Sequence, residues 1–187
     1  MRNLRLLAML IIIPLLHGCA AAVLGGAGTA VMVAEDRRTV GTVAEDQGIE
    51  LKAASRVRDR FKDLHVNITS YNRMVLLTGE APDAATRSEV EKTARAVENV
   101  RGVHNEIAVS GNTALSARAN DSYLTSKVKT RFIDQQKFNA IHVKVVTEAN
   151  VVYLLGLVRR KEADDATEIA RTTGGVQKVV KLFDYLD

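Results

Sequence analysis

An internal repeat constrains the fold of this chain more than any other feature of its 187 residues. The repeat has a period near 76 residues, with a six-residue insertion in the second copy around the letters DQQKFN. A period this long exceeds the unit of a solenoid and therefore predicts two tandem domains. The matching segments are RVRDRF (56–61) with KVKTRF (127–132), HVNI (65–68) with HVKV (142–145), MVLLTGE (74–80) with VVYLLGL (151–157), and residues 93–109 with residues 169–185.

Each copy predicts the same order of elements: helix, strand, strand, helix, strand. Apolar residues first recur at helical spacing, then alternate with polar ones as in a strand, and then form an apolar second strand. We therefore expect an α+β fold, with a three-stranded mixed sheet packed against two helices in each copy. The second strands are expected to stop at Gly79 and Gly156, the next helix to begin near Pro82 and Asp83, and the last strands to span 103–109 and 178–185.

The N-terminus has the layout of a secretory signal peptide over residues 1–18. Arg2 and Arg5 precede an apolar run, and Gly18 stands before the cysteine. The letters LLHGC resemble the bacterial lipobox, which predicts acylation of Cys19 and cleavage before it. Because Cys19 is the only cysteine, no intrachain disulfide can form, and acylation would consume the thiol.

An uncleaved anchor is the alternative, because residues 4–34 are apolar or small almost throughout. Pro14 and several glycines in that stretch disfavour a continuous helix. In lipoproteins, an aspartate after the acylated cysteine retains the protein at the inner membrane. Ala20 stands there instead, which implies the outer membrane with the polypeptide facing the periplasm. The expected segments are a lipidated N-terminus and flexible tether (19–44), a first domain (45–111), a linker (112–120) and a second domain (121–187).

Charge and motif spacing exclude several classes of function. Removal of the signal peptide would delete two arginines and no acids, so the formal charge would fall from +4 to +2. A balance this small does not indicate a nucleic-acid-binding protein. The four histidines show no metal-binding spacing, and His65 and His142 are expected to be solvated on the outer faces of their strands. No nucleophile motif or cofactor motif is present, so we expect no enzyme, metal or cofactor.

A basic amphipathic helix is predicted around the letters SYLTSKVKTRF (122–132). Leu124, Val128 and Phe132 would face the sheet, which leaves a stripe of residues four positions apart at the flank of the core. Lysine and arginine attract anionic lipid, and tyrosine favours the headgroup region. The predicted lipid-binding residues are Tyr123, Leu124, Lys127 and Arg131.

In the first copy, the positions that match this stripe are occupied by Lys52, Arg56 and Arg60, which provide charge without an aromatic residue. The second helix alone would therefore insert a side chain into the headgroup region. A second interpretation stays open, in which both helices simply carry a solvated basic edge.

The two copies also resemble a known family. A strand ending in glycine, then a helix, then the pattern of Val100, Gly102, Val103 and Asn105 is similar to the BON domain. The second copy keeps Gly175, Val176 and Val179 but has Lys181 in place of the asparagine. Two such domains behind a lipobox resemble the tandem-BON lipoproteins of the outer membrane.

The resemblance implies a lipid-anchored periplasmic protein that binds anionic phospholipid through its second domain and supports outer-membrane integrity. The alternative is an adaptor that holds protein partners, such as the outer-membrane assembly machinery.

Overall fold

The computed structural model describes residues 36–187, of which Arg37–Asp187 form one compact unit. The predicted signal peptide, Cys19 and most of the expected tether lie outside the described residues. Within the described part, no helix has both the length and the apolar character needed to cross a membrane. The first copy contains α4 (Val40–Arg60), β1 (Val66–Tyr71), β2 (Met74–Ala81), α5 (Ala84–Arg95), β3 (Gly102–Asn105) and β4 (Ala108–Val109). The second contains α6 (Leu115–Gln135), the 3-10 helix η2 (Ala140–His142), β5 (Val143–Glu148), β6 (Val151–Val158), α7 (Arg160–Arg171) and β7 (Lys178–Tyr185).

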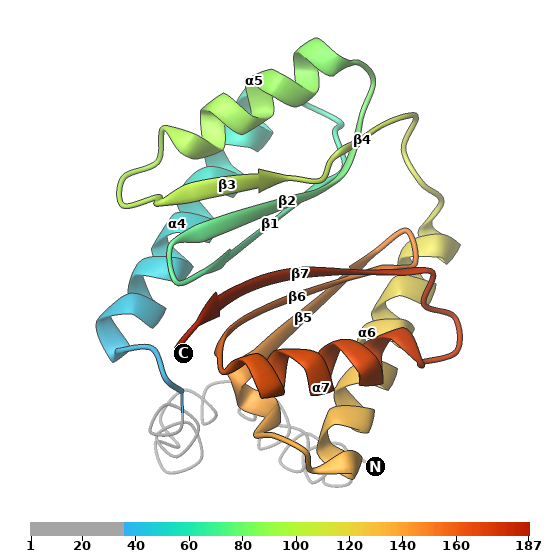
Figure 1. Cartoon of the computed structure of the whole chain (residues 1–187). Coiled ribbons are helices and arrows are strands. Elements are labelled where there is room, and N and C mark those ends of the chain that lie inside the picture. The colour runs from blue at the N-terminus through green and yellow to red at the C-terminus, as the bar shows by residue number, and fades with distance from the viewer. Residues whose placement is uncertain (1–35) are drawn as a thin grey trace, which may run out of the picture. The chain divides into compact units, whose positions relative to one another are not determined.

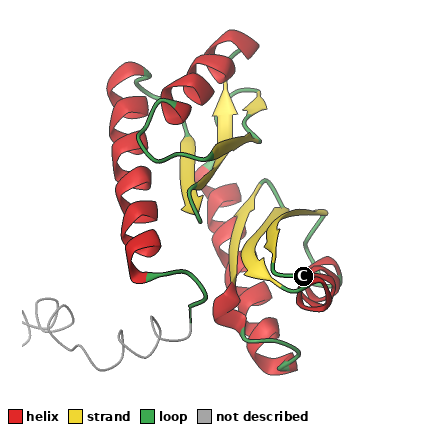
Figure 2. Cartoon of the chain, turned by 60° about the vertical axis from the view of Figure 1, so that its left-hand side comes forward, coloured by secondary structure: helices red, strands yellow, loops and turns green. Residues whose placement is uncertain are grey.

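Each copy is a mixed sheet with both helices on one face (Figures 1 and 2). β1 and β2 are antiparallel, and β3 and β4 both pair in parallel with β2. In the second copy β5 and β6 are antiparallel, and β7 pairs in parallel with β6 along its whole length. The predicted α+β fold and its helix–strand–strand–helix–strand order are therefore confirmed.

The last strand of the first copy is interrupted between β3 and β4, whereas the equivalent strand of the second copy, β7, is continuous. Asn105, at the end of β3, donates through Nδ2 to the Arg87 carbonyl of α5 and accepts from the Ile107 amide through Oδ1. These bonds turn the chain toward α5 before β4 resumes the pairing. Lys181 stands at the equivalent place in β7 and leaves that strand unbroken. The asparagine of the family pattern thus has a structural role in the first copy.

A buried aspartate holds the turn of each strand hairpin. Both turns place two consecutive residues at positive φ: Asn72 and Arg73 in the first copy, and Ala149 and Asn150 in the second. Such two-residue turns match the twist of the flanking strands but leave amides to be satisfied. Asp46 in α4 accepts from the amides of Asn72 (2.8 Å) and Arg73 (2.7 Å). Asp121 in α6 accepts from the amides of Ala149 and Asn150, both at 2.9 Å.

These aspartates correct the predicted alignment of the first helices. The buried faces run Asp46, Ile49, Ala53, Val57 in α4 and Asp121, Leu124, Val128, Phe132 in α6, which is an offset of 75 positions. The sequence match had paired Val57 with Val128, one helical turn away. Apolar and basic residues recur every four positions in both helices. An alignment shifted by one helical turn therefore still pairs apolar residues with apolar ones and basic residues with basic ones. The strands are offset by 77 positions, and the insertion is therefore two residues long, not six.

Several predicted boundaries also differ from the structure. α4 begins at Val40, capped by the Thr39 hydroxyl, inside the segment expected to be a tether. α6 begins at Leu115, inside the expected linker. β2 and β6 continue beyond Gly79 and Gly156 instead of stopping there. Gly79 has a φ of +109°, and a Cβ there would lie 2.0 Å from the His65 carbonyl oxygen. Glycine therefore allows the backbones of these two segments to approach each other closely.

Alternation along the central strands divides the buried side chains into three clusters. Val75 and Leu77 of β2 pack with α4 and α5, whereas Val152 and Leu154 of β6 pack with α6 and α7. The residues between them face the other way and meet in a third cluster, which contains Tyr71 and Leu76 of the first copy and Tyr153 and Leu155 of the second. Each copy thus has its own core, and the helix-free faces of both sheets share further packing.

Candidate membrane-contact site

Tyr123 lies on the exposed face of α6. The residue is 63% exposed, whereas the opposite face of the helix is buried against the sheet. The Lys127 Nζ lies 5.9 Å from the centre of the Tyr123 ring, at the outer limit of a cation–π contact. The structure therefore places an amphipathic ring and a cation next to each other on one accessible surface.

Lys127 and Arg131 also hold the end of α7. The Lys127 Nζ donates to the Gly174 carbonyl at 2.9 Å. The Arg131 guanidinium donates to the Ile169 carbonyl at 2.9 Å and to the Thr173 hydroxyl at 2.7 Å. Cations are favourable there, because the last carbonyls of a helix are unsatisfied and carry partial negative charge. Both side chains thus have a structural role that the sequence did not indicate, and both keep part of their surface in solvent.

Leu124, the fourth predicted residue, is only 2% exposed. A Cβ on Gly175 would lie 2.7 Å from its Cδ2 atom, so the leucine fills the space that this glycine leaves. Leu124 therefore positions α6 from within the core, and the accessible part of the predicted set consists of Tyr123, Lys127 and Arg131.

The corrected alignment changes the comparison with the first copy. Lys52 is equivalent to Lys127 and pairs with Glu98 at 3.3 Å, and Arg56 is equivalent to Arg131 and donates to the Ala96 carbonyl at 2.9 Å. Gly48 occupies the place of Tyr123. The first copy therefore has two cations but lacks the ring, and the predicted correspondence, which placed Lys52 opposite Tyr123, is wrong.

Two apolar residues that the sequence analysis did not single out share the exposed face of α6. Leu115 is 79% exposed and Ile133 is 62% exposed. At 100° per residue, both lie within about 80° of Tyr123 around the helix axis. Their distance from that residue along the helix hides the pattern in the sequence, because no single turn contains more than one of them. Once the buried positions are known, a count around the helix identifies them.

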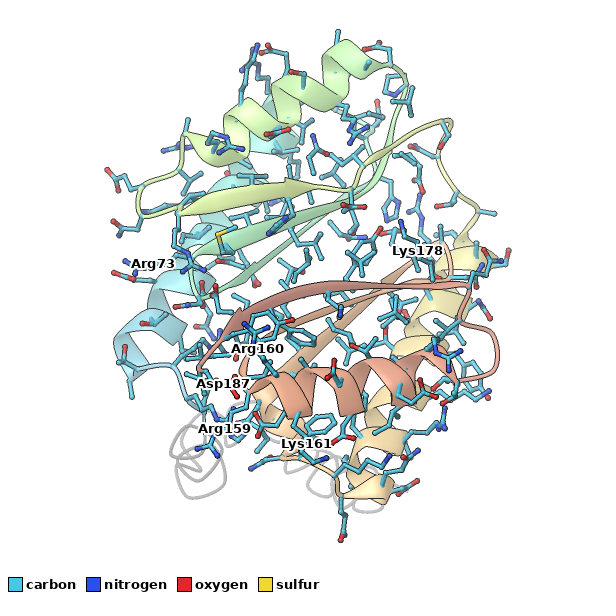
Figure 3. The ribbon with its side chains drawn as sticks, in the orientation of Figure 1. Arg73, Arg159, Arg160, Lys161, Lys178 and Asp187 are labelled. Atoms are coloured by element: carbon cyan, nitrogen blue, oxygen red, sulfur yellow. The ribbon has the colours of Figure 1, made fainter. Side chains whose placement is uncertain are left out.

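A second group of basic side chains stands at the beginning of α7, where Arg159, Arg160 and Lys161 follow one another (Figure 3). The Arg160 amide donates to Asp187 at 2.9 Å, and its guanidinium lies 5.0 Å from the centre of the Tyr185 ring. Lys161 pairs with Asp165 at 2.8 Å. The C-terminal aspartate and neighbouring side chains thus occupy this helix end, which makes it a weaker candidate for membrane contact than α6.

The sequence predicted that His65 and His142 are solvated, and this prediction is wrong. The side chains of His65 and His142 are only 14% and 12% exposed. His65 Nδ1 lies 2.9 Å from a carboxylate oxygen of Glu80, which is itself buried. Burial raises the pKa of Glu80, but hydrogen bonds from His65 and Thr113 outweigh it and leave the pKa below its usual value.

Glu148 of the second copy completes a group of possible metal ligands. One ligand atom each from His65, Glu80 and Glu148 lies within 4.8 Å of the others. Motif spacing missed this group because its members come from separate segments of both copies: His65 just before β1, Glu80 on β2 and Glu148 on β5.

Comparison with known proteins agrees with this architecture. The BON domain family matches residues 45–111 and 120–187. An outer membrane lipoprotein of Haemophilus influenzae, DolP, is 39% identical over 175 residues, which cover 92% of this chain and 91% of the relative. A 21 kDa hemolysin of Actinobacillus pleuropneumoniae is 31% identical, over 81% of this chain and 79% of its own. Osmotically-inducible protein Y of Escherichia coli is 30% identical, over 75% and 72%.

Tandem-BON proteins of this kind are not enzymes, as the sequence predicted. Two matched domains and a relative that is similar over nearly its whole length lead to one assignment. The chain belongs to the BON domain family, as a tandem-BON lipoprotein of the outer membrane.

Proposed function

We propose that this lipoprotein, anchored through Cys19 and facing the periplasm, binds anionic phospholipid through α6 of its second domain and thereby supports outer-membrane integrity. The observation that carries the proposal is the 63% exposure of Tyr123 beside Lys127 on the solvent face of α6. Leu115 and Ile133 on the same face extend the apolar surface that can enter a headgroup layer.

The intramolecular bonds of Lys127 and Arg131 are compatible with this function. Both cations keep their charge while they donate to α7, and an exposed charge acts over about 8 Å at physiological ionic strength. Each lysine or arginine near an anionic surface contributes about 1 kcal/mol. The bonds hold both side chains against the end of α7, with Lys127 beside the Tyr123 ring, so little side-chain freedom remains to be lost on binding.

The test uses residues 36–187, which contain the complete cores of both domains and no lipid anchor. Binding is measured by co-sedimentation with phosphatidylglycerol vesicles and with phosphatidylcholine vesicles. We expect binding to the anionic vesicles and a several-fold loss in both Tyr123→Ala and Lys127→Gln. Tyr123→Ala should depend more steeply on salt than the parent, and Lys127→Gln less steeply, because screening acts on charge and not on ring insertion.

Lys52→Gln is the matched control, because Lys52 occupies the same place in the first copy without a neighbouring ring. Equal losses from Lys52→Gln and Lys127→Gln would show that general basicity, not α6, drives contact. Unchanged binding in all three variants, or no binding by the parent, would contradict the proposal and favour the adaptor function.

A further inference from the structure

Two buried carboxylates from different domains approach each other beside His65. Glu80 on β2 is 3% exposed and Glu148 at the end of β5 is 6% exposed. Glu148 Oε2 accepts from Asn67 Nδ2 at 2.8 Å and from the Thr78 hydroxyl at 3.0 Å, so it is bonded entirely to the first domain. The group thus lies where the second domain touches the first.

The group has two carboxylates and one histidine; Arg118 of α6 lines the adjoining hollow, but within residues 36–187 it forms no ion pair with either carboxylate. Within residues 36–187, Glu80 forms an ion pair with His65, and Glu148 forms none. Burial of a carboxylate is costly unless a positive charge compensates it, and two that share a site repel each other. A protonated His65 would balance one of them. A divalent cation would balance both.

The chemistry of the ligands indicates which cation fits. An imidazole nitrogen with two carboxylate oxygens suits Zn²⁺ and related transition metals, whereas Ca²⁺ and Mg²⁺ prefer oxygen alone. Within residues 36–187, no hydrogen bond reaches the second Glu148 oxygen, Oε1. His65 and Glu148 also line a hollow of about 410 Å³, which gives an ion access and leaves room for water ligands.

We propose that His65, Glu80 and Glu148 form a transition-metal site that fastens the two BON domains together. On binding, the metal replaces the proton between His65 and Glu80 and draws in the Glu148 carboxylate. Because the ligands come from both domains, a bound ion stabilises their docked arrangement over any arrangement in which they separate. None of the three ligands lies on α6, although Ser122 and Thr125 of that helix line the same hollow, and the metal proposal does not depend on the lipid proposal.

The test uses residues 36–187 after treatment with a chelator, titrated with ZnCl₂ by calorimetry, with thermal unfolding followed in parallel. We expect one Zn²⁺ per chain and a Tm that rises with zinc concentration. His65→Gln and Glu148→Gln should each weaken zinc binding at least tenfold. His104→Gln, at a histidine of β3 outside the group, should bind zinc as the parent does.

Glu148→Gln also separates metal binding from simple packing. Without zinc this variant should be at least as stable as the parent, because it removes one uncompensated buried charge and keeps the side-chain shape. It also carries the test if His65→Gln does not fold. Absence of zinc binding by the parent, unchanged affinity in Glu148→Gln, or an equal rise in Tm with Ca²⁺ would each overturn the proposal.

Discussion

The Arg37 guanidinium forms a bidentate ion pair with the Glu162 carboxylate. Its Nη1 lies 2.6 Å from Oε2 and its Nη2 lies 2.7 Å from Oε1, and Nη1 also donates to the Leu157 carbonyl at 3.0 Å. The next residue, Arg38, instead reaches the first domain, where it pairs with Asp46 at 2.9 Å and lies 4.0 Å from the centre of the Tyr71 ring. The residues that lead from the N-terminal segment into the first domain are therefore fastened to both domains.

This pair makes stability depend on pH. Hydrogen bonds from Arg37 lower the pKa of Glu162 to about 2, from an ordinary value of 4.5. A lowered pKa stabilises the fold above the unfolded pKa, and this stabilisation is lost as pH falls from about 4.5 toward 2. We expect Arg37→Ala to lower the free energy of unfolding by about 1–2 kcal/mol at pH 7, since the pair is only partly buried.

Urea unfolding of the parent and Arg37→Ala at pH 7, 4 and 2.5 measures this effect. The difference between the two proteins should shrink as pH falls. Arg37→Lys should recover only part of the loss, because lysine cannot form the two-pronged contact. A difference that stays constant from pH 7 to 2.5 would mean that the Glu162 carboxylate is not the partner that matters.

The hairpin aspartates predict unequal losses in the two copies. Asp46 accepts from two turn amides, from the Ser70 hydroxyl at 2.6 Å and from Arg38. Asp121 accepts from two turn amides alone among the described residues. An asparagine would turn an NH₂ group toward donors in either place, so Asp46→Asn should cost about 2–4 kcal/mol and Asp121→Asn about 1–3 kcal/mol.

Hydrogen exchange gives the local measurement. Amides 72 and 73 should lose protection in Asp46→Asn, and amides 149 and 150 in Asp121→Asn. Retained protection of these amides from hydrogen exchange in both variants would show that the turns keep their structure without the aspartates.

The sequence predicted the elements because their signals are local. The spacing of Ala53 and Val57, the alternation in HVNI, and Asp83 at the start of α5 each depend on a few neighbouring residues. Alignment of the copies failed by one turn because an amphipathic helix resembles itself after four residues. Asp46 is the feature that fixes the alignment, and its role depends on amides that lie 26 and 27 positions away.

Contacts between the two copies could not be predicted from short stretches of sequence, although one pattern indicated them. The apolar runs in β2 and β6 lack the alternation of a strand with one solvated face, which indicates burial on both sides. Leu76 and Tyr153 lie on those second faces and meet in the shared cluster. His65 was wrongly expected to be solvated for the same reason, because it lies beside Glu80 and Glu148, where the two copies meet, and not in water.

Anchoring gives a prediction that depends on the sequence alone. Cys19 is the only cysteine, so Cys19→Ala should leave a longer, unacylated precursor. Membrane fractionation and intact mass measure the outcome. Cys19→Ser, which also lacks the thiol, should behave in the same way. A variant that matures at normal size and still fractionates with the outer membrane would contradict acylation at this position.

The last prediction adds to the first copy what it lacks. Gly48 stands in α4 where Tyr123 stands in α6, and a Cβ there would meet no atom within 4 Å. Position 48 therefore accepts a Cβ, and Gly48→Tyr should stabilise α4 by about 0.5 kcal/mol, because glycine is a poor helix former. If a ring beside a cation is what binds lipid, as proposed for α6, the variant gains a second contact next to Lys52. Residues 36–187 carrying Gly48→Tyr should bind anionic vesicles several-fold more tightly than the parent, and the gain should survive added salt better than the parent's own binding does. Gly48→Ala is the control, because it gives the helix stabilisation without the ring. Equal vesicle binding by the tyrosine and alanine variants would show that a ring beside a lysine is not sufficient for lipid contact in this fold.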